Sequence, residues 1–451
     1  MEDFIFTPIV LLVGLAIHAV VLRFHDREEG RVLTLSFAFH VAASIGLILI
    51  YTLYYTEGGD MITYHRFSVP IADGLRFDFE AIAPEVLNLL FQQEQRLPFE
   101  VVGESSTGSM QAVAVVLSFI LGDSLYAGAL MITIWSYVSK VLIYRALRDV
   151  VRARSRQLLL FAVMLSPSGI IWTSGLLKEP MVMVFVGPLV LSFRWLLEGR
   201  RLALAIVTGL VAGGGIALFK PYVLIALVIA GGVWITWARV IRDRGAIALK
   251  PGYLALAALV VFIGFSGATK FFPKLTLDSV GESMAFQRRV AGEVAGASNF
   301  SVEGPGVDVE STQNLSLTSQ LSLAPFALVT SLFRPFIFEA RKAMQVLNAL
   351  EMTWLLILFF QAFWGSGFAR AINFVIQEPV LMFCVTFVLV LALGTGLSTA
   401  NLGALSRYRA PMMPFFLFLL LAVRAERRST NARSSSPQQQ PTSQLAPAQQ
   451  G

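Results

Sequence analysis

Long apolar runs recur along the whole chain, and they constrain the fold more than any other feature of the sequence. Each run has about 18 or more residues, which is enough for one helix to cross the hydrocarbon core of a bilayer. Of the 451 residues, 56% are hydrophobic and only 14% are charged, whereas a soluble domain has about 25% charged residues. The sequence therefore predicts an all-α, polytopic integral membrane protein.

The apolar runs predict about eleven spanning helices within a transmembrane domain at 1–428. The first run lacks a basic leader and a small-residue cleavage site, so we expect an uncleaved first helix. The last segment, 429–451, is rich in Ser, Pro and Gln, a composition that predicts a disordered tail. The predicted helix cores are 6–22, 33–55, 124–145, 157–174, 180–197, 202–218, 221–238, 251–271, 346–364, 378–397 and 410–423.

Short clusters of basic residues lie in every second connection between the predicted helices. These clusters predict the orientation of the chain. The clusters around Arg27, Arg148, Arg200, Arg242 and Arg427 all fall on one side if the helix count is right. The positive-inside rule makes that side the cytoplasm. We therefore expect an inner (cytoplasmic) membrane protein with its N-terminus outside and its C-terminus inside. Because the net charge of +6 comes from these clusters, it does not indicate a nucleic-acid partner.

Two long segments are predicted to lie on the outer side, at 56–123 and 272–345. The first contains an amphipathic stretch at 81–95 and an apolar run at 112–122 that is too short to span, so we expect an interfacial or re-entrant helix there. The second has a Gly- and Ser-rich middle and ends in an apolar stretch at 323–338. Pro325 and Pro335 interrupt that stretch, which we expect at the membrane surface.

The first outer segment opens with a candidate site, the stretch from Glu57 to Arg66. Gly58 and Gly59 precede Asp60, and such residues allow a tight turn and a close approach of another group. Asp60 is the predicted catalytic base. A turn-forming acid is the alternative role for Asp60. Supporting contacts to a sugar or phosphate are predicted for the residues that follow, Tyr64, His65 and Arg66.

Other outer turns carry charged residues that the positive-inside rule does not predict there. Three short turns are basic, and a common anion would explain all three. Each residue also has a simpler reading: the lysines could reach the headgroups, the arginines could be interfacial anchors, and Glu339 could pair with Arg334 or Lys342. The predicted substrate-binding residues in these turns are Lys178, Glu179, Lys220, Arg334, Glu339, Arg407 and Arg409.

A phosphate or pyrophosphate attached to a lipid would fit such a site at the outer leaflet. Guanidinium groups bind phosphate oxygens bidentately, and a lysine acts as a point charge. A single carboxylate could deprotonate an acceptor hydroxyl while the cations stabilise the departing phosphate, which predicts inversion at the sugar carbon. We predict no metal and no cofactor, because the chain has only four histidines and one cysteine, although a divalent cation could accompany the phosphate.

These residues resemble the GT-C superfamily of polyprenyl-phosphate-sugar glycosyltransferases. Gly59-Asp60 with Tyr64-His65 is similar to the start of the first outer loop of that superfamily, and Ser166-Pro167 with Lys178-Glu179 is similar to a later helix and charged turn. The resemblance implies that Asp60 is the catalytic base and that the outer cations bind the lipid phosphate. The substrate would be a polyprenyl-phosphate- or polyprenyl-pyrophosphate-linked saccharide, used in exopolysaccharide or O-antigen synthesis together with other assembly proteins. Two further stretches carry this resemblance, Phe119 to Ala127 and Tyr144 to Arg148, and Asn401 to Pro411 resembles a block of related polysaccharide-assembly membrane proteins.

The chain departs from the superfamily pattern because its acid follows the second predicted helix and stands with Glu57 rather than in an Asp-Glu pair. A Wzy-like repeat-unit polymerase or ligase is therefore an alternative, and it would give weight to Arg288, Arg289 and Arg334. A transporter or flippase is a further alternative, which predicts charges throughout the membrane depth rather than at one face. A structural scaffold would not explain three basic outer turns.

Overall fold

The computed structural model describes residues 2–53, 59–97, 105–242, 323–341, 343–364, 367–399 and 401–435. The predicted helix at 251–271, most of the second long segment and the candidate residues Glu57, Arg288 and Arg289 lie outside these residues. Regular structure in the described part is helical throughout, as the continuous apolar runs predict.

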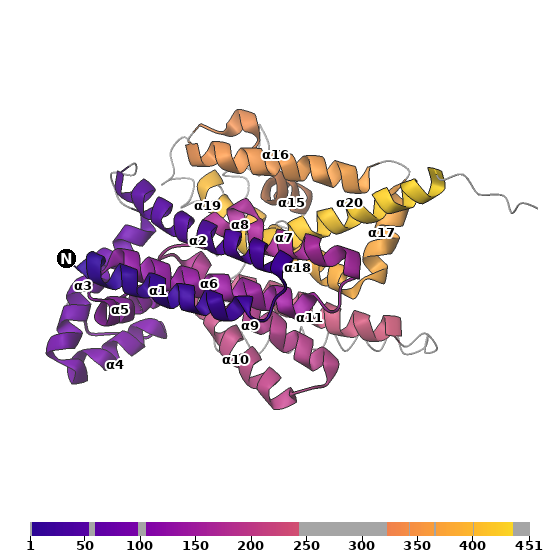
Figure 1. The fold of residues 1–451 in the computed structure, drawn as a ribbon. Coiled ribbons are helices and arrows are strands. Elements are labelled where there is room, and N and C mark those ends of the chain that lie inside the picture. Colours follow the sequence, from indigo (N-terminus) through magenta and orange to yellow (C-terminus); the bar gives the residue numbers. More distant parts are fainter. Residues whose placement is uncertain are drawn as a thin grey trace, which may run out of the picture.

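Eight described helices are long and apolar enough to cross a membrane, and they run along one another in a bundle (Figure 1). They are α1 (Glu2–Leu22), α2 (Arg27–Leu53), α6 (Leu125–Leu147), α9 (Lys178–Glu198), α10 (Leu202–Phe219), α11 (Pro221–Arg242), α16 (Ala343–Phe363) and α18 (Pro379–Ser398). The shorter helices are α3 (Asp60–Phe77), α4 (Phe79–Leu90), α5 (Ser106–Leu121), α7 (Arg156–Leu165), α8 (Pro167–Ile171), α15 (Ala324–Phe333), α17 (Phe368–Gln377) and α19 (Leu402–Tyr408), and α20 (Met413–Ser435) closes the described chain. These helices are consistent with a multi-pass membrane protein.

Two of the eleven predicted spans differ from the structure. The predicted helix at 157–174 is broken at Ser166, which is extended between α7 and α8, because the proline at 167 can begin a helix but disfavours helical geometry in the residue before it. The predicted helix at 410–423 belongs to a pair, α19 with α20, that bends by 42°. If that pair forms one span, the described residues contain nine.

Polar contacts define two opposite ends of the bundle. At the first, which we call the basic end, Arg148 lies 3.4 Å from Glu29 and Arg152 lies 2.5 Å from Glu378. At the second, which we call the Asp60 end, α3 begins beside the end of α2, with the Tyr51 ring against Gly59. The helices alternate between these ends in the order that the arginine clusters predict. The side of the membrane on which each end lies remains a prediction.

The predicted outer segment at 56–123 contains three helices rather than mainly loop. Helices α3, α4 and α5 pack together at the Asp60 end (Figure 1) around a small core of their own that includes Ile71, Leu89 and Val115. The stretch predicted as amphipathic at 81–95 contributes α4. The short apolar run at 112–122 lies in α5, one side of which packs on α3, α4 and α10, while Val116 and Ile120 are 46% and 60% exposed.

The stretch at 323–338 is helical between its two prolines. Pro325 lies in the first turn of α15 and Pro335 follows the end of that helix, so neither proline breaks it. One face of α15 packs on α18, where Gly396 meets the backbone of Ala327. The last helix, α20, extends to Ser435 and so includes the first residues of the segment predicted as a tail.

The close packing of α6 on α9 depends on a glycine. A Cβ atom on Gly187 would overlap the backbone oxygen of Ser139, whereas a Cβ on Gly214 of α10 would meet nothing within 4 Å. We expect Gly187→Ala to destabilise the protein by roughly 1–3 kcal/mol through overpacking and Gly214→Ala to be neutral or slightly stabilising. Thermal unfolding of both variants in one detergent tests this, and equal melting temperatures would contradict the packing.

Candidate functional site

Gly59 fixes the position at which α3 begins. Its φ of +130° is a conformation that only glycine adopts without strain. A Cβ atom at this position would also overlap the Tyr51 ring. The glycine therefore lets α3 start against the end of α2, and it places Asp60 in the first turn of α3.

A second glycine brings the start of α9 to the start of α3. Gly175 has a φ of +87°, and a Cβ on it would overlap the side-chain methyl of Met61, the residue after Asp60. Its backbone N–H donates to the Thr133 hydroxyl at 2.8 Å, which ties the turn to α6. The chain then enters α9 with Lys178 and Glu179 in the first turn.

Charged side chains from four separate segments meet at this point, and we call them the Asp60 cluster: Asp60, Lys178, Glu179, Lys220 and Arg407. Arg407 Nη2 lies 2.6 Å from Asp60 Oδ2, and Arg407 Nε lies 3.5 Å from Glu179 Oε1. Lys220 Nζ lies 2.7 Å from the same Glu179 oxygen. The structure thus brings together the three basic turns that the sequence analysis attributed to a common anion.

The cluster has a buried part and an accessible part. The Glu179 and Lys220 side chains are 1% and 4% exposed, whereas the Asp60 side chain is 48% exposed. Arg407, at 18% exposed, links the two parts. A substrate could therefore reach Asp60, while the Glu179–Lys220 pair lies beneath it.

Three tyrosines surround the cluster. Lys220 Nζ lies 4.1 Å from the centre of the Tyr408 ring and 5.9 Å from that of Tyr222, distances at which a cation is attracted to an aromatic face. Tyr64 lies one turn after Asp60 in α3. Burial, together with the nearby Asp60 charge, raises the pKa of Tyr64, so its phenol stays protonated and can donate a hydrogen bond.

Lys178 is the cation of the cluster that pairs with hydroxyls rather than with a carboxylate. Its Nζ donates to Ser106 Oγ at 3.1 Å and to Thr107 Oγ1 at 2.8 Å, at the start of α5. The cluster contains three cations and two carboxylates, which leaves one excess positive charge. That excess favours the binding of an anion.

Three other predicted ligands form a separate group. Arg334 donates from Nε to Glu339 at 3.1 Å, which confirms the alternative that Glu339 pairs with Arg334. Arg409 donates to the backbone oxygens of Ser331, at 3.2 Å, and of Arg334. Because Arg409 is 0% exposed, it faces no substrate in this structure and instead joins α19 to the end of α15.

The helical geometry of α3 separates His65 and Arg66 from Asp60. Asp60 and Tyr64 are four positions apart, so they share one face of the helix, while Arg66 is exposed. Burial lowers the pKa of His65, although Asp3 and Asp123 oppose the shift. His65 is therefore neutral near pH 7 and offers no positive charge to a phosphate. Because the sequence pattern does not predict a helix here, it does not separate these residues.

Two ionisable residues inside the bundle, Lys140 and Glu351, are not among the predicted site residues. Lys140 of α6 is 0% exposed, lies 2.9 Å from His40 Nε2 and donates to the backbone oxygen of Gly169. Glu351 of α16 accepts hydrogen bonds from the Ser168 N–H at 2.9 Å and from its hydroxyl at 3.1 Å. Both stabilise the short helix α8. The signal in each case was one ionisable residue within an apolar run.

Comparison of the chain with family models, curated proteins and solved structures finds no match. Among the described residues, no group of three or more His, Cys, Asp or Glu side chains could hold a metal ion.

The buried pair beneath Asp60 should make a large contribution to stability. We expect Lys220→Met to destabilise the protein by about 3 kcal/mol, because it leaves Glu179 buried with Arg407 as its remaining partner. The double variant Glu179→Gln/Lys220→Met should cost less than the sum of the single variants. Arg194→Met removes a partly exposed i,i+4 pair with Glu198, whose side chains are 18% and 30% exposed, and should cost less than the buried pair, about 1 kcal/mol. Strictly additive single-variant effects would contradict this coupling.

Proposed function

We propose that the protein is a membrane glycosyltransferase that takes a sugar or oligosaccharide from a polyprenyl-phosphate or polyprenyl-pyrophosphate carrier. The supporting observation is the Asp60 cluster, in which a half-exposed carboxylate lies beside Arg407 and near Lys178 at one end of a helical bundle. A lipid-linked phosphate lies at the depth of such an end. The proposed product is a cell-surface polysaccharide such as an exopolysaccharide or O-antigen.

In the proposed reaction, Asp60 takes the proton from an acceptor hydroxyl. The hydroxyl oxygen forms a bond to the anomeric carbon of the sugar, and the bond from that carbon to the phosphate oxygen breaks. The phosphate leaves with the bonding electrons. Arg407 and Lys178 stabilise the negative charge that grows on it, and this kind of electrostatic stabilisation is often the largest contribution to catalysis. One displacement inverts the sugar carbon and needs no covalent intermediate.

In this scheme Arg407 contacts both Asp60 and the phosphate of the substrate. It holds Asp60 in the structure, and its guanidinium has five N–H groups in a planar fork. It can therefore bind a phosphate oxygen while it keeps a contact with Asp60 or Glu179. Lys220 supports Arg407 indirectly, because it neutralises part of the Glu179 charge. Tyr64 is 2% exposed, so its phenol lies beneath the site rather than against a substrate.

The proposal also includes the number of membrane spans and the orientation of the chain in the membrane. A GT-C-like bundle of about eleven spans in the inner membrane would place the Asp60 end at the outer leaflet and the basic end in the cytoplasm. The N-terminus would then be outside and the C-terminus inside. A Wzy-like polymerase or ligase would use the same leaflet and the same kind of carrier, with Arg334 and the second long segment in larger roles.

A transporter for the same lipid-linked saccharide is a second candidate, and Lys140 and Glu351 favour it. Both lie inside the bundle rather than at its end, where ionisable groups often mark a transport path. Their contacts support a structural role instead, because each binds the backbone of the short helix α8.

The role of Asp60 can be tested against another aspartate of the same helix. Asp73 is 62% exposed and pairs with Arg76, so Asp73→Asn should leave activity close to wild type. Asp60→Asn should lower glycosyl transfer by at least about 100-fold, because it removes the base, while the protein still inserts in the membrane. The measurement is polymer formation by membranes that contain equal amounts of each variant. Wild-type polymer from Asp60→Asn would refute the assignment.

The transport alternative predicts a different result for Lys140. In liposomes that contain the purified protein, we expect Lys140→Met to lower thermal stability by roughly 1–3 kcal/mol, because His40 and the Gly169 carbonyl lose a buried partner. The folded fraction should keep its transferase activity. Movement of a lipid-linked saccharide across the liposome membrane by the wild type, lost in Lys140→Met, would favour the transporter.

A further inference from the structure

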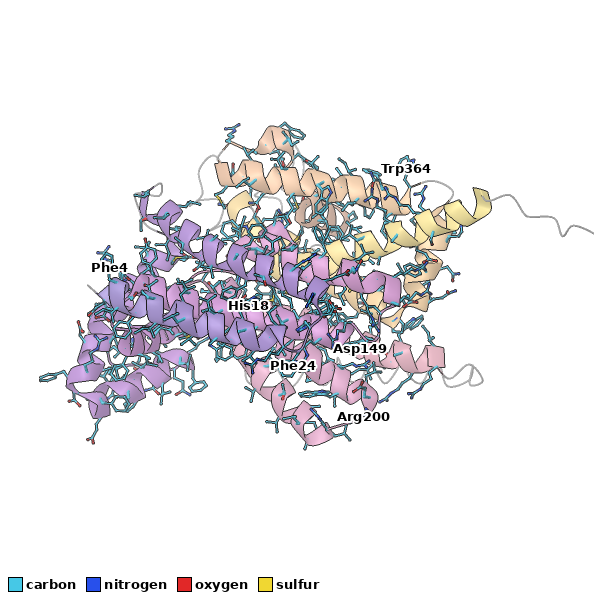
Figure 2. The ribbon with its side chains drawn as sticks, in the orientation of Figure 1. Phe4, His18, Phe24, Asp149, Arg200 and Trp364 are labelled. Carbon is cyan, nitrogen blue, oxygen red and sulfur yellow. The ribbon has the colours of Figure 1, made fainter. Side chains whose placement is uncertain are left out.

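A groove opens at the basic end between the last turn of α16 and the middle of α20. It has a volume of about 430 Å³ and is lined by Phe360, Gln361 and Trp364 of α16 and by Arg424, Arg427 and Arg428 of α20. The two helices run beside one another (Figure 1), and Trp364 lies at the same end of the bundle as Asp149, away from Phe4 (Figure 2). We propose that this groove binds the headgroup of an anionic phospholipid. This site is distinct from the Asp60 cluster and does not depend on the proposed activity.

The groove carries positive charge without a carboxylate of its own. The three arginines are spaced at i, i+3 and i+4, so they share one face of α20. The acid of the same turn, Glu426, pairs instead with Arg152, at 3.6 Å, and with Arg154. Arg427 donates to the Gln361 backbone oxygen at 3.0 Å, which fixes one wall of the groove. Within the described part of the chain, no ion pair joins Arg424 or Arg428 to a carboxylate.

The groove also lies at the depth of lipid headgroups. The apolar part of α16 ends at Phe363, and the next residue, Trp364, is 69% exposed. A tryptophan with this exposure at the end of a span is typical of the membrane interface, where its ring meets the headgroup region. Phe360, one turn earlier, is 44% exposed and offers an apolar surface to the upper acyl chains of a bound lipid. A bound lipid could therefore place its phosphate among the arginines and its glycerol region on the two rings.

The chemistry of the groove favours a phospholipid over the C-terminal segment 436–451 as the occupant. Guanidinium groups bind phosphate oxygens in a bidentate manner, and basic pockets between spanning helices at the cytoplasmic side bind anionic headgroups. The sequence that follows α20, at 436–451, contains no Asp or Glu and so offers these arginines no side-chain carboxylate. An anionic headgroup supplies that charge.

Lipid titrations of the purified full chain, followed by native mass spectrometry, test the proposal. We expect phosphatidylglycerol to bind at least about tenfold more tightly than phosphatidylcholine, and Arg424→Gln/Arg428→Gln to weaken phosphatidylglycerol about 10- to 30-fold. Arg428→Gln alone changes an exposed residue and should weaken it by roughly fivefold without affecting folding. The matched control is Arg239→Gln/Arg242→Gln, at the end of α11, which should bind phosphatidylglycerol like the wild type.

Three results would overturn the proposal. The first is equal binding of the two lipids by the wild type. The second is unchanged phosphatidylglycerol binding in both groove variants, or an equal loss in the Arg239→Gln/Arg242→Gln control, which would indicate a general effect of charge. The third is displacement of the lipid by inorganic phosphate at a concentration equal to that of the lipid. This result would show that the arginines select a soluble phosphate.

Discussion

The buried contact of Glu179 with Lys220 and Arg407 is the interaction on which the Asp60 end depends. A carboxylate with 1% of its side chain exposed is stable in such a place only when cations and hydrogen bonds compensate for its lost hydration. The two cations come from segments that are far apart in the sequence, so their attraction to Glu179 holds α9, the α10–α11 turn and α19 together. Arg407 then reaches from this buried pair to Asp60, and α3 joins the same group.

This arrangement explains how one end of the bundle can be both rigid and accessible. The lower part of the Asp60 cluster is closed by tyrosines and by the glycine-dependent contacts of α3 with α2 and with the turn before α9. The upper part leaves Asp60 half-exposed, and Lys178 donates there to two hydroxyls. A site that binds an anionic substrate needs such a combination, because fixed charges bind a phosphate without reorganisation. The basic end differs, since several of its carboxylates pair with arginines, and three of its cations line the α16–α20 groove.

The sequence predicted the helical class, most of the spans and the meeting of Asp60, Lys178, Lys220 and Arg407. These predictions succeeded because they rest on hydrophobic length and on the positive-inside rule, both of which are visible in a single sequence. It could not predict that α3 is a helix, since its mixed polar composition resembles a loop and its stability comes from packing against α5. It also could not separate Arg407 from Arg409, because a difference of two positions in a short helix decides which one faces the cluster and which is buried. The break at Ser166 and the buried Lys140 are linked by a tertiary contact, because Lys140 donates to the Gly169 carbonyl of α8. The local sequence pattern does not show such a contact.

A structure of the full chain with a polyprenyl phosphate bound would test the central claim most directly. The account predicts that the phosphate lies within hydrogen-bond distance, about 2.7–3.2 Å, of Arg407 or Lys178. Asp60 should face the position that the anomeric carbon of the sugar would occupy in a phosphate-linked donor. A phosphate bound at the basic end, or one at the Asp60 end that contacts neither cation, would contradict it.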